Sequence, residues 1–143
     1  MNRDTLSLLQ DCSQGIELAV SSMDGILPNV QDQVLRRKLR DSLRTHEALR
    51  NQTQNLLQQW GGKEKLPSAM TRGTVWLKNH TRLALNRDDP TAAELVADGC
   101  DQGVRALCRS RNRYIGAHQE AVFLAEQIIA CQENLSGSLR SFL

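Results

Sequence analysis

Apolar residues recur along this chain at alternating spacings of three and four positions, the repeat of a helix that buries one face. The first such helix is predicted over residues 4–27 and ends before Pro28. The second runs from residue 29 or 30 to residue 60 and ends at Gly61-Gly62. The inward positions are Leu9, Cys12, Ile16, Ala19, Met23 and Ile26 in the first helix, and Leu35, Leu39, Ser42, His46, Leu49, Thr53, Leu56 and Trp60 in the second.

The rest of the chain predicts three more helices after the linker GGKEKLP at residues 61–67. A shorter helix is expected over about residues 67–85. Asp89 is then a cap residue, with Pro90 at the first position of a helix over 90–114. Gly116 interrupts the pattern, and the last helix spans 117–142. The inward positions are Ala69, Gly73, Trp76, His80 and Leu83 in the short helix, and Ala121, Ala125, Ile128, Leu135, Leu139 and Phe142 in the last.

A five-residue motif is nearly repeated: CSQGI at residues 12–16 is similar to CDQGV at residues 100–104. The first and fourth helices therefore look like copies, and each is followed by a break and another long helix. This predicts a single all-α domain over residues 1–143, a four-helix bundle of two hairpins (4–60 and 90–142) joined by a crossover that contains the fifth helix. Where the copies cross, Gly15 and Gly103 are expected to let the two backbones approach, with Cys12 and Cys100 beside them.

The segment RGTVWLK at residues 72–78, followed by a DDP cap, is similar to the linking helix of a known family. The chain resembles the ferritin-like superfamily, and within it the small bacterial ferritin-like domains of unknown function. That resemblance implies a bundle with one long crossover. It also raises the possibility of two iron or manganese ions, held by a Glu on each of two helices and a Glu-x-x-His word on each of the others.

The sequence departs from that metal-binding pattern. Leu43 stands three residues before His46, Ile115 stands three before His118, and Glu17 aligns with Arg105 rather than with a second carboxylate. A symmetric site for two metal ions is therefore not expected, and neither a metal nor a cofactor is predicted. The alternative that stays open is a divergent metal or redox protein with irregular ligands. Those ligands would be Glu17, His46, Glu47 and Cys12.

Composition limits the other possibilities. The net charge is +2, acids are mixed among the bases, and no apolar run approaches the roughly 20 residues of a membrane span. The N-terminus lacks the features of a signal peptide, so a cytoplasmic location is expected, where Cys12, Cys100, Cys108 and Cys131 stay reduced. None of these cysteines forms a CxxC pair, so they are interpreted as small buried hydrophobes.

The sequence predicts no catalytic residues, because no nucleophile-elbow word or Gly-rich phosphate loop is found. The basic runs RRKLRDSLR (36–44) and RSRNR (109–113) are interpreted as solvated helix faces rather than as nucleic-acid contacts. The favoured function is a non-catalytic interaction or structural module. It is expected to form a homodimer or another homo-oligomer that covers leftover apolar surface, such as Leu43, Val75, Leu77 or Phe123.

Overall fold

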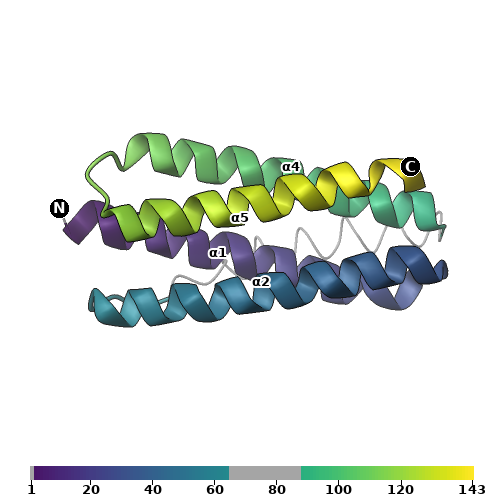
Figure 1. The fold of residues 1–143 in the computed structure, drawn as a ribbon, viewed down its shortest axis with the longest axis horizontal. Coiled ribbons are helices and arrows are strands. Elements are labelled where there is room, and N and C mark those ends of the chain that lie inside the picture. Colours follow the sequence, from purple (N-terminus) through teal and green to yellow (C-terminus); the bar gives the residue numbers. More distant parts are fainter. Residues whose placement is uncertain (1, 65–87) are drawn as a thin grey trace.

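Four long helices form a bundle in the computed structural model, which describes residues 2–64 and 88–143 (Figure 1). The described residues contain no strand, so the all-helical prediction is confirmed. The predicted helix over 67–85, including His80, Val75 and Leu77, lies outside the described residues. The helices are α1 (Asn2–Ile26), α2 (Gln33–Gln59), α4 (Asp89–Arg113) and α5 (Gln119–Ser138), and the 3-10 turns Leu27–Asn29 and Arg140–Phe142 follow α1 and α5.

Each helix packs against antiparallel neighbours. Helices α1 and α2 form one hairpin, α4 and α5 form the other, and the hairpins meet through α1 against α4, α2 against α5 and, across the bundle, α1 against the parallel α5. Within the described residues α2 and α4 occupy opposite corners of the bundle, at the bottom and the top of Figure 1. They run in the same direction, so the end of α2 and the start of α4 lie at opposite ends of the bundle (Figure 1).

The start of α2 differs from the prediction of residue 29 or 30. Leu27–Asn29 continue the chain beyond α1 as a 3-10 turn, and α2 begins only at Gln33. Asp32 is the N-cap, because its carboxylate accepts a hydrogen bond from the Leu35 N–H at 2.9 Å. At the other end of α2 the helix stops as predicted, at Gly61, whose φ of 74° is a left-handed conformation that glycine adopts without strain.

The cap of α4 is Asp88, not Asp89 as predicted. The Asp88 carboxylate accepts a hydrogen bond from the Thr91 N–H at 2.9 Å. Asp89 is the first residue of the helix, and its side chain binds the loop between α1 and α2 instead. The last helix is shorter than predicted, since α5 ends at Ser138 and only the turn Arg140–Phe142 follows.

Each hairpin loop is fastened by an acid in the first turn of the other hairpin. Asp89 of α4 accepts hydrogen bonds from the backbone N–H groups of Gln31 and Asp32, at 2.9 and 2.8 Å. Asp4 of α1 accepts one from the N–H of Gly116, at 2.9 Å. These loop amides have no helical partner of their own, so the carboxylates both satisfy them and hold the hairpins together.

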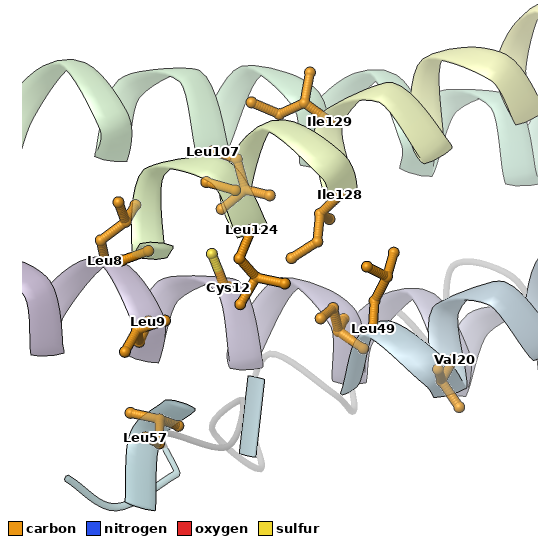
Figure 2. Packing of buried hydrophobic residues seen from close by; sticks show 13 residues of the cluster. Leu8, Leu9, Cys12, Val20, Leu49, Leu57, Leu107, Leu124, Ile128 and Ile129 are labelled. Carbon is orange, nitrogen blue, oxygen red and sulfur yellow. The ribbon is translucent and has the colours of Figure 1, made fainter. Parts of the chain in front are cut away.

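The core consists of two apolar clusters, one toward each end of the bundle. The first cluster contains Leu8, Leu9, Cys12, Ile16, Val20, Leu49, Leu57, Leu107, Ala121, Leu124, Ala125, Ile128 and Ile129. Figure 2 shows Cys12 among the leucine and isoleucine side chains of this cluster. The second cluster contains Met23, Ile26, Val30, Leu35, Leu39, Ala92, Ala93, Leu95, Val96, Cys100, Leu135 and Leu139.

The expected glycine contact between α1 and α4 is wrong. A Cβ atom at Gly15 would meet nothing within 4 Å, so no backbone approaches closely there. A Cβ atom at Gly103 would collide with the side chain of Gln132 on α5 instead. The two repeated motifs also lie at different distances from the aspartate that binds the opposite loop. Cys12 lies eight residues after Asp4, whereas Cys100 lies eleven residues after Asp89. The shift is close to one helical turn, so the words keep their helix face but lie at different levels.

Exposed apolar side chains agree only in part with the prediction. Phe123 is 62 % exposed, as expected, and Ile115 is 88 % exposed. Leu43 is not leftover surface, because it is partly buried and packs against both core clusters. Across the described helices, none has a segment long and apolar enough to cross a membrane.

We predict that Asp89→Ala lowers the free energy of unfolding by about 1–2 kcal/mol, because two loop amides lose a charged acceptor while water can still reach them. Urea denaturation followed by circular dichroism measures the change. Asp24→Ala is the control, since Asp24 is exposed and its loss should stay within about 0.5 kcal/mol. Equal effects of the two substitutions would contradict the fastening role of Asp89.

The two glycines of the repeated word should respond differently to alanine. Gly15→Ala is expected to raise the free energy of unfolding by about 0.5–1 kcal/mol, because it gains helix propensity at no steric cost. Gly103→Ala should raise the free energy of unfolding by less than this, or lower it, because the Gln132 side chain is only 2 % exposed and has to move. Thermal unfolding of both variants provides the comparison, and equal gains would show that Gln132 yields freely.

Candidate functional site

A polar layer separates the two core clusters near the middle of the bundle. On α2 the gap between Leu39 and Leu49 contains the fully buried His46, and on α5 the gap between Ile129 and Leu135 contains Gln132, which is 2 % exposed. The full layer consists of Ser42 and His46 of α2 together with Cys131 and Gln132 of α5. Of these four residues, the sequence predicted only His46 as a candidate site residue.

His46 is held by its own helix. Its Nδ1 lies 2.8 Å from the carbonyl oxygen of Ser42, 3.3 Å from the Ser42 hydroxyl and 3.7 Å from the Cys131 sulfur. A carbonyl oxygen can only accept a hydrogen bond, which assigns the proton to Nδ1. The Nε2 atom then carries a lone pair, and it has no hydrogen-bond partner in the described structure. His46 is therefore a neutral imidazole anchored at one nitrogen.

Gln132 was missed in the sequence. The inward positions predicted for the last helix passed from Ile128 directly to Leu135, although residue 132 lies four positions after one and three before the other. That spacing was the available clue to its burial. Its side chain points at Gly103 of α4, where an added Cβ atom would collide with Gln132 Oε1 unless that side chain moved. Among the described side chains, Gln132 Oε1 is buried without a hydrogen-bond partner, like His46 Nε2.

Burial governs the acid–base behaviour of the layer. Desolvation lowers the pKa of His46 below its ordinary 6.5, and the hydrogen bond to the Ser42 carbonyl opposes this only in part. Burial likewise raises the pKa of the Cys131 thiol, against an opposing hydrogen bond from the Ser42 side chain. At neutral pH both groups are therefore uncharged. A neutral thiol is a poor nucleophile and a poor metal ligand.

The interpretation of all four cysteines as buried residues is right for Cys12 and Cys100, whereas Cys108 and Cys131 are only partly buried. Cys12 is fully buried, and burial, with a smaller effect of the nearby Asp11, raises its pKa to about 12. Cys100 reaches about 12 for the same main reason, with Cys131 and Asp101 adding to the effect. The interpretation of these two cysteines as small core residues agrees with their place in the two clusters.

The alternative metal ligands are not brought together. Glu17 of α1 pairs with Arg50 of α2, with 3.4 Å between Oε1 and Nη1. Cys12 belongs to the first cluster, whereas His46 lies in the polar layer. Over residues 2–64 and 88–143, no three His, Cys, Asp or Glu side chains are grouped so that they could hold a metal ion.

His118 has a structural role at the end of the bundle. It is the N-cap of α5, and its Nδ1 accepts a hydrogen bond from the Glu120 N–H at 3.2 Å. Its own N–H donates to the Thr5 hydroxyl at 2.9 Å, and its ring lies 5.2 Å from that of Trp60. His118 thus joins α5 to the start of α1 through its backbone N–H and to the end of α2 through its ring.

The first basic run forms a groove on α2. It is lined by Gln33, Arg36, Arg37, Arg40, Asp41 and Arg44. The second run is more engaged: the guanidinium of Arg111 lies 3.8 Å from the carboxylate of Glu126, and that of Arg113 lies over the ring of Tyr114. The α2 groove is therefore the more available basic surface.

Comparison with known proteins leaves the function open. No protein-family model matches the chain, and neither a curated protein nor a solved structure matches it.

The buried imidazole predicts a pH dependence of stability. The unfolded chain takes up a proton on His46 near pH 6.5, whereas the folded chain resists protonation until a lower pH. The free energy of unfolding should therefore fall as pH drops through about 6.5 and keep falling until the lowered folded pKa is reached. His46→Gln cannot titrate, so the difference between wild type and this variant isolates the effect in urea titrations. A difference that does not change with pH would contradict the burial of a neutral His46.

Proposed function

We propose that this chain is a non-catalytic helical-bundle protein, related to the ferritin-like superfamily, that acts as an interaction or structural module and forms homo-oligomers. The observation that carries the proposal is that His46 is buried and hydrogen-bonded within its own helix. The central imidazole donates from Nδ1 to the Ser42 carbonyl at 2.8 Å and lies fully buried between two apolar clusters. A core histidine held in this way specifies packing, as buried polar groups do when they fix the arrangement of helices.

The surface supports the same proposal. Phe123 and Ile115 expose large apolar side chains near the turn between α4 and α5, and the α2 groove presents several guanidinium groups. Aromatic and arginine side chains are among the groups that are enriched in protein interfaces. The ferritin-like relationship is supported by two antiparallel hairpins in which α2 and α4 run in the same direction, as a bundle with one long crossover requires (Figure 1).

One observation favours a second candidate, a divergent metal or redox protein. The Nε2 atom of His46 carries a buried lone pair without a partner among the described residues, and a neutral imidazole nitrogen is a common metal ligand. Such a protein would need further ligands to move toward His46 when the metal binds. Glu17 would have to leave Arg50, and Cys12 would have to lose a proton from a thiol whose pKa is about 12.

Elemental analysis of protein purified without an affinity tag separates the two candidates. The proposed module contains less than about 0.1 equivalent of iron, manganese or zinc per chain, since a structural or catalytic site retains near one. His46→Ala then leaves the metal content unchanged. Near-stoichiometric metal that is lost in His46→Ala would instead establish the metal protein. Light scattering on the same sample gives the oligomeric mass.

A further inference from the structure

One outward face of α5 contains no charged residue. Its members are spaced by three or four positions and lie opposite the buried Ala121, Ala125 and Ile128. They are Gln119, Phe123, Gln127, Ala130, Asn134 and Gly137, all exposed except the half-buried Gln127. We call this set the neutral face of α5. The helix runs along the front of the bundle in Figure 1.

Exposed apolar side chains gather around this helix. Among the described residues four large hydrophobic side chains are exposed, and Phe123, on the neutral face, is 62 % exposed. Ile115 lies in the turn before α5, and Leu143 lies shortly after it. The fourth, Val34, lies at the start of α2. A partner that covers Phe123 gains the free energy of removing an aromatic ring from water.

Gly137 is a second feature that nothing in its own chain explains. It lies within α5 without a positive φ, and a Cβ atom there would meet nothing within 4 Å. Glycine lowers helix stability relative to alanine, so its steric use at this position is to let a group from outside the chain approach closely. Gly25 and Gly99 are exposed and equally unobstructed, but in the described structure Gly137 alone shares its helix face with an exposed aromatic side chain.

Phe123 and Gly137 lie at equal distances from Ala130. Each is seven positions away, which is two helical turns or about 10 Å along the axis. An antiparallel second α5 centred on Ala130 therefore places Phe123 against Gly137 of the second copy, and the same contact forms again at the other end. Gln127 then comes level with Asn134 of the second copy, and two amides can hydrogen-bond to each other. The seven-residue spacing suits helices that cross at about 20°.

We propose that the neutral face of α5 binds the same face of a second copy of this chain, with Phe123 of each copy packed over Gly137 of the other. The proposal rests on the homo-oligomer of the proposed function and names its interface. Both copies use the same residues, so the contact closes as a twofold dimer. Antiparallel pairing also brings the exposed Ile115 to the same end of the dimer as Leu143 of the second copy.

The charges beside the neutral face limit the affinity. Glu126 and Glu133 flank it on one side, and antiparallel pairing brings Glu133 level with Glu126 of the second copy. The repulsion is reduced because the Glu126 carboxylate lies 3.8 Å from the guanidinium of Arg111. Two helices of 20 residues, each about 30 Å long, bury less than the roughly 800 Å² per partner of a standard interface. We therefore expect a weak dimer, with a Kd on the order of 10–100 µM.

Other occupants fit the neutral face less well. A membrane surface would be bound by basic side chains beside the apolar ones, whereas α5 contains three glutamates and neither lysine nor arginine. A helix of a different protein would have to present a small residue opposite Phe123 and a large one opposite Gly137. A second copy supplies both at the right distance by symmetry.

Two substitutions that fit each other test the contact. Phe123→Ala removes the ring, and Gly137→Phe fills the place against which that ring packs. Both variants should fold, because Phe123 is exposed and a side chain at position 137 enters open space. Gly99→Phe is the control, since it adds the same ring at an exposed, unobstructed glycine on α4. Sedimentation velocity from about 5 to about 500 µM brackets the expected Kd, and circular dichroism confirms folding.

We expect wild type and Gly99→Phe to pass from one 16.0 kDa chain to two as concentration rises, and to stop there. Phe123→Ala and Gly137→Phe should each dimerise at least about tenfold more weakly. An equal mixture of these two variants should recover wild-type association, because every ring in the mixed dimer then faces a small residue. Association at about 500 mM NaCl should be no weaker than at about 50 mM, since the flanking charges repel.

The outcomes separate this interface from the proposed homo-oligomer. A wild type that stays monomeric up to about 500 µM, well above the expected Kd, contradicts both. An oligomer that neither single variant weakens overturns the interface and leaves the homo-oligomer standing. The same conclusion follows if the single variants are monomeric and their mixture stays so, or if the wild-type mass continues beyond two chains.

Discussion

The apolar stripe of each helix leaves water only by packing against the other helices, and this constraint determines what the few buried polar groups can do. Two apolar clusters fill the ends of the bundle, so His46 and Gln132 lie where no water surrounds them. Desolvation keeps the imidazole neutral and the neighbouring thiols protonated. The same burial that makes the layer resemble an active site removes much of its reactivity.

At the ends of the bundle, charged contacts add to the apolar packing. Asp4 and Asp89 each fasten the loop of the opposite hairpin through exposed backbone amides. The two aspartates are therefore equivalent reference points in the two hairpins. Measured from them, the repeated motifs at Cys12 and Cys100 are displaced by about one helical turn. The displacement explains why Gly103 accommodates Gln132 while Gly15 faces open space.

Sequence periodicity predicted the four described helices and most of the inward positions of α1, α2 and α5, because burial of one helical face leaves a regular pattern. It could not predict that Asp88 caps α4 while Asp89 reaches the other loop, since adjacent carboxylates are equivalent until the hairpins are placed. It also passed over Gln132, because a polar residue breaks an apolar pattern. The isolation of His46 from Glu17 and Cys12 depends on helix rotation and level, which spacing alone does not determine.

The central claim is that His46 is a neutral structural imidazole with its proton on Nδ1. Long-range ¹H–¹⁵N NMR of the histidine ring nitrogens measures this state directly. We expect one protonated nitrogen, Nδ1, and an unprotonated Nε2 whose resonance stays in place when zinc, manganese or ferrous iron is added at neutral pH. A charged imidazolium at neutral pH, or an Nε2 resonance that shifts on addition of one equivalent of metal, would contradict the account.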